Sequence, residues 1–342
     1  GIADALLARP APGRALLAAR LHDQLGYTLA YGPAQDNPEA EAHWQRCIDL
    51  LRPLKGDGTP QELRYLLQCE GSRLINFGYH ATPPEALEPA VVLVTGDGRD
   101  ARARFPDDRE ILSRVITGMA ASINALVDLK RVEDARTVAD EALALAEQAF
   151  AFEPGRIHNL RILLAILRDR VALDTRAGQR SPDVLRARAL YAADQLAKRD
   201  PDNRDSLTMS ATAILGLFRQ VADDPARRAE RLALASRASR TGRLDGAIAL
   251  DLEPIASLEL LRRALQPPAS PAATPAFDAL RAAIKVDGRS DWDAARAYAD
   301  GAVTDGDALR GEPVGEPYRW VVRWLRERAC ARSTARCLPA SF

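Results

Sequence analysis

Small and apolar residues recur at helical spacing along most of the chain. Ala135, Ala139 and Ala142 follow one another at intervals of four and three residues, and alanines within 295–302 repeat that spacing. Residues at i, i+4 and i+7 lie on one stripe of a helix, so a neighbouring helix can approach closely there. The pattern therefore predicts helices that pack against helices.

The helical pattern is itself repeated. Six segments share a polar or proline-containing start followed by small and apolar residues, and they begin at Pro38, Pro83, Val132, Ser181, Pro225 and Asp291. A further helical stretch precedes each of them, over residues 13–32, 60–79, 107–128, 155–176, 204–222 and 274–286. The starts are 45, 49, 49, 44 and 66 residues apart. Because two helices per unit of this length are typical of solenoids, the sequence predicts an all-α, right-handed solenoid of antiparallel helix pairs.

Two stretches depart from the repeat. Residues 91–105 combine a β-branched run with a Gly-Asp-Gly turn, which predicts either a short surface hairpin or a helix end followed by a long loop. Residues 266–275 are rich in Pro, Ala and Ser, which predicts a linker or an extended loop. We therefore expect a helical-repeat domain over 1–265 and a C-terminal helical module over 276–342 that completes or caps the array.

Composition and charge narrow the function. Apolar residues make up 47% of the chain but aromatic residues only 5%, so the core must consist mainly of Ala and Leu, as closely packed helices allow. Basic and acidic residues number 47 each, so no net charge attracts nucleic acid or an anionic membrane. Charges interrupt every Leu-rich stretch, and we expect no membrane contact from this segment itself.

No pattern of catalytic, cofactor-binding or metal-binding residues stands out. The four histidines show no paired spacing and no CxxC occurs, which argues against a metal site. The turn around Gly96 lacks both nucleotide-binding glycine patterns, GxxxxGK[ST] and GxGxxG. Acidic residues alternate with Arg as exposed i,i+4 pairs do, so no acid–base pair can be singled out. We expect no enzyme activity and no cofactor. The alternative at this point is a helical enzyme whose pocket carries no recognisable motif.

The four cysteines fall into two local pairs. If the helices on either side of Gly56 form an antiparallel hairpin, Cys47 and Cys69 lie at similar heights, and Cys330 and Cys337 would close a short loop after the last helix. The sequence therefore predicts the disulfides Cys47–Cys69 and Cys330–Cys337 and an oxidising compartment. The alternative is that the first pair are buried thiols, which behave as small hydrophobic side chains.

Several segments resemble a known repeat. The second helix of a tetratricopeptide repeat resembles a pattern found here: a small residue, a large one four positions later, a small one three positions after that, and then a proline. LGYTLAYG from Leu25 is similar to the end of a first helix of such a repeat. LGYTLAYG, AQDN, EAEAHWQRCIDLLRPL and DWDAARAYA together resemble the tetratricopeptide-like C-terminal regions of bacterial Hanks-type serine/threonine kinases. None of the kinase domain's own motifs is present: no Gly-rich loop, HRD or DFG occurs.

The resemblance implies a binding groove on the concave face, which first helices line. With Gly26 as the small position of the first helix, the candidate contacts are Arg20, Asp23, Tyr27, Tyr31, Arg73, Asn76, Tyr79 and Asn124. Asn and Arg bind peptide backbones and carboxylates, and Tyr supplies rigid contact area. The alternative is that these residues pack in the core or are solvated.

The resemblance also implies a role. It predicts a periplasmic sensor or interaction domain that belongs to a bacterial transmembrane serine/threonine kinase, follows an upstream membrane helix and binds a protein, a peptide or a small signal molecule. The alternative is a cytoplasmic scaffold or adaptor built on the same solenoid.

Overall fold

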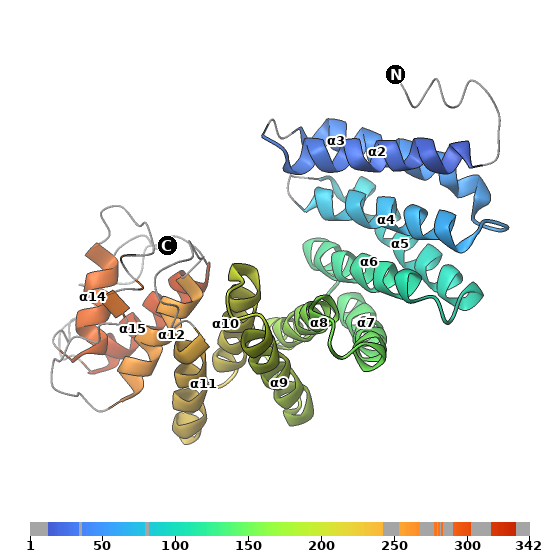
Figure 1. Ribbon diagram of the computed structural model, residues 1–342. Helices are drawn as coiled ribbons and strands as arrows, with labels where there is room; N and C mark the ends of the chain where they lie inside the picture. The colour runs from blue at the N-terminus through green and yellow to red at the C-terminus, as the bar shows by residue number, and fades with distance from the viewer. Residues whose placement is uncertain are drawn as a thin grey trace. The chain divides into compact units, whose positions relative to one another are not determined.

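The computed structural model of the protein is built from α-helices, and no strand occurs in the part of the chain that it describes (Figure 1). It describes residues 13–33, 36–78, 82–241, 253–266, 277–278, 280, 282, 290–301 and 316–332. The chain forms two compact units, Gly1–Leu173 and Asp174–Phe342. The all-helical fold class predicted from the sequence is confirmed.

The first unit is a succession of long helices, each packed against the next (blue to green in Figure 1). They are α2 (Arg14–Tyr31), α3 (Asn37–Leu51), α4 (Pro60–Phe77), α5 (Pro84–Arg104), α6 (Arg109–Asp128) and α7 (Val132–Phe152). A 3-10 turn, η1 (Arg52–Leu54), extends α3. α4 also packs against both α2 and α6, so alternate helices touch as well as consecutive ones. α8 (Ile157–Arg176) begins in this unit and ends in the second.

The second unit continues with α9 (Asp183–Arg199), α10 (Arg204–Arg219), the 3-10 turn η2 (Pro225–Arg227), α11 (Arg228–Thr241), α12 (Glu253–Leu265), α14 (Ser290–Ala299) and α15 (Glu316–Arg332). Here α10 packs against α9, α11 and α12, and α12 packs against α11, α14 and α15. The boundary between the compact units, after Leu173, falls inside the range 1–265 that the sequence analysis treats as one domain. Of the expected linker at 266–275, the structure describes only Gln266.

Some of the helices, among them α4 and α6, begin where the sequence supplies a capping side chain. Thr59 and Glu62 form a complete capping box at the start of α4, with Pro60 in the first turn. The side chain of Asp108 accepts hydrogen bonds from two backbone amides at the start of α6. Each cap satisfies amides that have no partner within the helix, and so fixes where the helix starts.

The hairpin considered for residues 91–105 is wrong, because these residues lie within and just after α5. Val91, Val94, Gly98 and Ala101 are buried at helical spacing, so the β-branched run fills one face of a helix. A Cβ built at Gly98 would lie 3.4 Å from the side chain of Val115 on α6. This glycine therefore serves the close approach of two helices rather than a turn.

The predicted alanine stripes face the core. Ala135, Ala139 and Ala142 are all fully buried on α7, and Ala295 is fully buried on α14. Ala302, which the same spacing includes, lies outside the described residues. Small side chains at these positions let helix axes approach, which explains how a core with few aromatic residues is filled.

The contact between α2 and α3 depends on one glycine. Trp44 is fully buried, and a Cβ built at Gly26 would lie only 2.7 Å from its ring. The indole Nε1 donates a hydrogen bond to the buried carboxylate of Asp23 at 3.2 Å, which holds the ring in place. Trp44 therefore cannot move aside easily, and only glycine fits opposite it.

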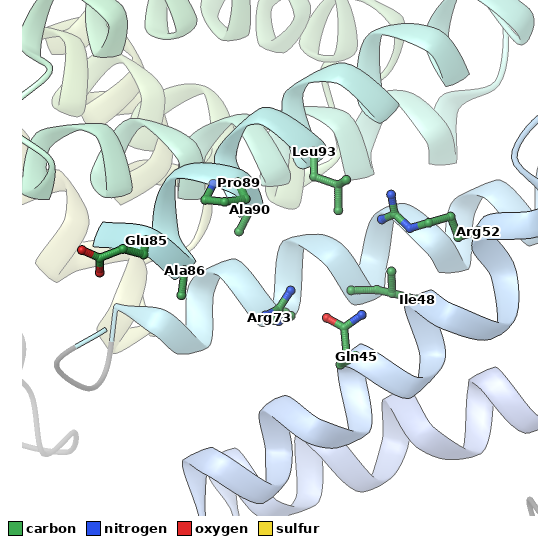
Figure 2. A pocket seen from close by; sticks show the side chains of 9 residues that line it. All are labelled: Gln45, Ile48, Arg52, Arg73, Glu85, Ala86, Pro89, Ala90 and Leu93. Atoms are coloured by element: carbon green, nitrogen blue, oxygen red, sulfur yellow. The ribbon is translucent and has the colours of Figure 1, made fainter. Parts of the chain in front are cut away.

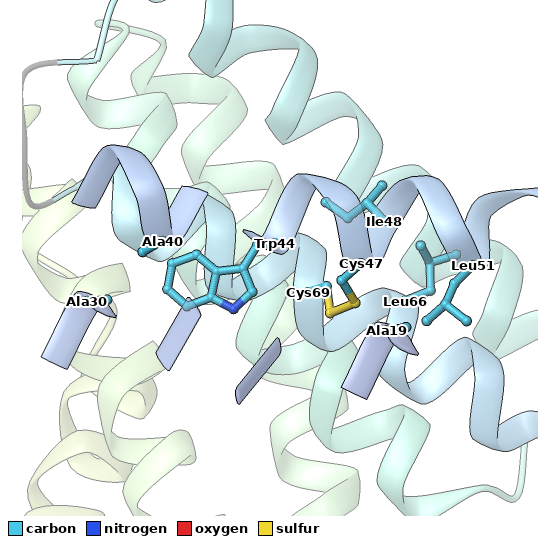
Figure 3. Packing of buried hydrophobic residues seen from close by; sticks show 9 residues of the cluster. All are labelled: Ala19, Ala30, Ala40, Trp44, Cys47, Ile48, Leu51, Leu66 and Cys69. Atoms are coloured by element: carbon cyan, nitrogen blue, oxygen red, sulfur yellow. A yellow bond between two sulfur atoms is a disulfide. The ribbon is translucent and has the colours of Figure 1, made fainter. Parts of the chain in front are cut away.

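A disulfide joins α3 to α4 inside this core. Cys47 and Cys69 are bonded, with their Cα atoms 6.3 Å apart, which confirms the first predicted pairing. Both are fully buried, and Figure 3 shows the bond between Trp44 on one side and Leu51 and Leu66 on the other. Cys330 lies on α15, whereas Cys337 lies outside the described residues, so the second pairing stays a prediction.

Replacement of glycines within helices should have opposite effects at two positions. Gly26→Ala should destabilise the protein by roughly 1–3 kcal/mol, because the new methyl group overlaps the ring of Trp44. At Gly96 on α5 a new Cβ would have no neighbouring atom within 4 Å, so Gly96→Ala should stabilise the protein by about 0.5–1 kcal/mol through helix propensity. Urea unfolding of both variants measures the difference. Equal effects of the same sign would show that the contact with Trp44 is not a constraint.

Loss of the disulfide should destabilise the first unit. The bond closes a loop of 22 residues, which the chain-entropy model values at about 3 kcal/mol. The Cys47→Ala/Cys69→Ala double variant should lower the free energy of unfolding by roughly 2–4 kcal/mol, since it also removes buried sulfur atoms. In the native wild type, a reducing agent should release these thiols only as the unit unfolds. A double variant as stable as the wild type would contradict this account.

Candidate ligand-binding site

Some of the predicted groove residues lie at the surface. Tyr27 and Tyr31 on α2 are 40% and 50% exposed, and their ring centroids lie 5.5 Å apart. Arg20 is exposed, with its guanidinium carbon 5.3 Å from the ring centroid of Tyr65 on α4. Asn124 is exposed on α6. These side chains are available to a partner, as the groove hypothesis requires.

Asp23 and Asn76 do not reach the surface, so the prediction that they line a groove is wrong. Asp23 is fully buried and accepts hydrogen bonds from Trp44 and from Nε2 of Gln68, the latter at 2.6 Å. Burial raises the pKa of the Asp23 carboxyl, and these two hydrogen bonds oppose that shift. Asn76 is also fully buried, and its Nδ2 donates to the carbonyl of Asn37 at 3.0 Å. Both residues hold helices together.

Arg73 lies among residues of α3, α4 and α5 that line a cavity. Tyr79 lies outside the described residues. Nη2 of Arg73 donates to Oε1 of Glu41 on α3 at 3.1 Å. The guanidinium carbon lies 4.9 Å from the ring centroid of Phe77. Arg73 therefore belongs to a cavity formed by α3, α4 and α5, and the predicted set does not gather in one place.

The cavity has a volume of about 320 Å³ (Figure 2). Its lining residues come from three helices and η1, and they are Gln45, Ile48, Arg52, Arg73, Glu85, Ala86, Pro89, Ala90 and Leu93. In Figure 2 the α5 residues line one side and those of α3 the other, with Arg73 of α4 between them. Two guanidinium groups, one carboxylate, one amide and several aliphatic side chains surround a space large enough for a few side-chain-sized groups, and the charges of the lining sum to one positive charge. Such a lining suits a ligand with an apolar part and a negative charge.

A buried charged cluster lies behind Arg52. Nη2 of Arg52 donates to Oε1 of Glu70 at 2.8 Å, and its Nη1 lies 3.8 Å from Oδ2 of Asp97. Nζ of Lys55 contacts Asp97 at 2.6 Å and Asp100 at 2.7 Å. The side chains of Glu70 and Asp97 are 0% and 7% exposed. Two cations and three carboxyl groups therefore form one cluster, in which Glu70 and Asp97 are buried whereas Arg52, Lys55 and Asp100 reach the surface.

The Glu70 carboxyl keeps its proton at neutral pH. Burial, a hydrogen bond to Asp97 and the negative charge of Asp97 together raise the pKa of Glu70 to about 9, against smaller opposing effects of Arg52 and Lys55. Oε2 of Glu70 and Oδ2 of Asp97 are buried, and no N–H or O–H of the described residues donates to either. A proton on Glu70 that is donated to Asp97 satisfies both oxygens at once.

The sequence contained a signal for Glu70 that the interpretation of its acidic residues missed. Glu70 follows the buried Leu63, Leu66 and Leu67 at helical spacing, so it occupies a core position of α4. Asp97 lies in the stretch considered as a turn, but it is buried on α5. The assignment of acidic residues to exposed i,i+4 pairs is therefore wrong for these two, whose basic partners come from other segments.

The second unit has a cavity of about 450 Å³ where α9, α10 and α11 approach one another. Its charged lining residues are Lys198, Arg237, Arg240 and Asp194, and Asp194 forms a 3.4 Å ion pair with Arg237. Lys198 and Arg240 lie in the last turns of α9 and α11. Cations are favourable at helix C-termini, which accounts for their placement without a ligand.

No group of three or more His, Cys, Asp or Glu that could hold a metal ion occurs within the described ranges. α6 is long and apolar enough to cross a membrane by length and composition alone. Its apolar residues are nevertheless largely buried against α4, α5 and α7, as those of a core helix are.

Comparison of the chain with protein-family models, with curated proteins and with solved structures found no match. The geometry of the cavity and the helix arrangement therefore carry the functional argument.

Glu70→Gln should change the stability of the protein in a pH-dependent way. The reference pKa of Glu is 4.5 and the folded value is about 9, so folding holds a proton that the unfolded chain releases. The stability contributed by protonated Glu70 is fully present below pH 4.5 and is lost as the pH rises to about 9. Glutamine resembles the protonated form of Glu70. The free energy of unfolding of the variant, relative to that of the wild type, should therefore increase with rising pH, by roughly 1–3 kcal/mol at pH ~8.

Urea unfolding at pH ~5 and pH ~8 checks this prediction. Glu133→Gln is the matched control, because the side chain of Glu133 on α7 is 80% exposed. The control should show nearly the same difference from the wild type at both pH values. The same difference for Glu70→Gln at both pH values would mean that Glu70 is ionised in the folded protein.

Proposed function

We propose that this chain is a tetratricopeptide-like binding module that holds a carboxylate-bearing protein segment, peptide or small signal molecule in the cavity of α3, α4 and α5. Two observations support the proposal: a repeated polar contact between helix pairs and the lining of the cavity.

Polar contacts between helices recur at a nearly constant sequence separation. Arg64 bonds Asp108 and Arg109 bonds Glu153, each 44 residues away, and Arg99 bonds Glu141 at a separation of 42. In the second unit Arg186 bonds Glu230, again 44 residues away. A constant offset between partners is what stacked copies of one helix pair produce. Together with the packing of α4 on both α2 and α6, this supports a solenoid of the tetratricopeptide-like kind.

The cavity is the observation that carries the binding function. Arg52 and Arg73 approach it from η1 and α4, and each has more N–H donors than its present partners use. Ile48, Ala90 and Leu93 offer aliphatic contact beside them. A carboxylate next to an apolar group would match both features, since guanidinium groups bind carboxylates through paired hydrogen bonds.

Two further features support a location for the module in the cell. A buried disulfide such as Cys47–Cys69 is typical of proteins in oxidising compartments. The resemblance of residues 15–53 to the C-terminal regions of bacterial Hanks-type kinases supports a role as the periplasmic regulatory part of such a kinase. Ligand binding in the cavity would then alter the arrangement of the receptor.

Selection of peptides from a random library displayed on phage tests the binding function. The immobilised chain should enrich peptides that share an acidic residue or a free C-terminus beside an apolar residue. Ala86→Trp places a large side chain in the cavity and should reduce enrichment at least about tenfold, because the indole would fill much of the space between α3 and α5.

Ala103→Trp is the matched control, because Ala103 is exposed on the same helix and does not line the cavity. The control should enrich the same peptides as the wild type. Equal loss in both variants, or no enrichment by the wild type, would refute the cavity as the binding site.

A further inference from the structure

Arg52 belongs to two sites at once. Its side chain is 37% exposed and lines the cavity, while the same guanidinium donates to buried Glu70 and lies 3.8 Å from Asp97. Any change in the charge of these two carboxyl groups therefore acts directly on a residue that faces the ligand. We propose that the proton shared by Glu70 and Asp97 regulates the cavity, so that an anionic ligand binds well only while that proton is present. This inference rests on the proposed function.

The charge balance of the cluster gives the direction of the effect. With Glu70 protonated, Arg52 and Lys55 are matched by Asp97 and Asp100. Loss of the proton adds one negative charge directly behind the cavity. Arg52 is then drawn onto an ionised Glu70, and an incoming carboxylate meets a like charge that is buried and therefore less screened than a surface charge.

The charged groups that face Glu70 come from η1, the residues after it and α5. Burial and Asp97 raise the pKa of Glu70 to about 9, and Arg52 and Lys55 oppose the shift. On the side of α4 that faces α2, Asp23 accepts from Gln68, and Arg114 of α6 acts on that carboxylate. The proton is therefore controlled by the cluster on the α5 side.

Ligand binding in turn affects the protonation of Glu70. A bound carboxylate attracts Arg52 away from Glu70, which removes a positive charge that lowers the Glu70 pKa. Binding and protonation thus favour each other, as thermodynamic linkage requires. A ligand would be held more tightly at lower pH and released as the pH rises.

The proton is tested first, without any ligand. Carbon-13 labelling of glutamate side chains gives one carboxyl signal per residue, and the Glu70 signal is identified by its loss in Glu70→Gln. We expect this signal to titrate above pH ~8 in the folded protein. A Glu70 signal that titrates in the usual carboxyl range overturns the inference whatever the cavity binds.

The link to binding is tested with N-acetyl-leucine, which carries one carboxylate beside an apolar side chain, and with N-acetyl-leucine amide as its neutral counterpart. Wild-type affinity for N-acetyl-leucine should fall about tenfold between pH ~8 and pH ~10, because the protonated fraction of Glu70 falls by that factor. Glu70→Gln should lose less than about twofold over the same range. The exposed Glu133→Gln control should follow the wild type.

Three results would overturn the link: equal wild-type affinity at both pH values, the same loss in Glu70→Gln as in the wild type, or equal binding of the neutral amide. Asp97→Asn provides a second variant, since removal of that charge should move the loss of affinity to lower pH. Binding of N-acetyl-leucine without pH dependence sinks the inference but leaves the proposed function intact. No binding of N-acetyl-leucine at any pH, with no peptide enriched from the phage library, sinks both.

Discussion

The close contact between Gly26 and Trp44 constrains the start of the first unit. A residue with any side chain at position 26 would overlap the buried indole, and the indole is tied to Asp23 by a hydrogen bond. Asp23 in turn accepts from Gln68 of α4, so one carboxylate connects three helices. The disulfide joins α3 to α4 next to this group. Few aromatic residues are needed because helices that approach this closely leave little space to fill.

Buried polar groups in this unit fall into two kinds. Asp23 accepts hydrogen bonds from the neutral side chains of Trp44 and Gln68, and Asn76 donates one to the carbonyl of Asn37, so both serve packing. Glu70 and Asp97 instead share a proton and contact two cations, one of which reaches a cavity. At neutral pH Glu70 takes up a proton on folding that the unfolded chain lacks, so the fold is less stable there than at acidic pH. A cost of this kind, next to an opening lined by arginines, is what we expect of a binding site rather than of packing alone.

The proposed function unites these features without a catalytic step. Stacked helix pairs present a cavity between neighbouring pairs, and the same residues that fill the junction supply its charges. In the proposed sensor role, a ligand in the cavity would be coupled to a proton in the core. A solenoid of the proposed kind would transmit such a change, because each pair in it contacts its neighbours through a continuous core.

Local pattern alone determined the helices of this chain. The period of small residues and the polar or proline-containing starts placed most helix starts within a few positions, and the spacing around Gly56 paired Cys47 with Cys69. These features depend on residues close in sequence, or on a hairpin whose turn is visible in the sequence. Residues 91–105 were ambiguous because β-branched and glycine residues favour a hairpin in isolation, whereas packing against α6 favours a helix.

Only the tertiary structure decided the site. Asp23, Asn76 and Arg73 occupy similar helical positions in the sequence pattern, yet two are buried and the third lines a cavity on α4. Burial of one side of a helix depends on which neighbours cover it, and that is set by helices 20 to 45 residues away. The proton on Glu70 has the same origin, since its pKa is set by burial and by Asp97 on another helix. The sequence determined which segments are helical, and the packing of those helices determined which side chains can act together.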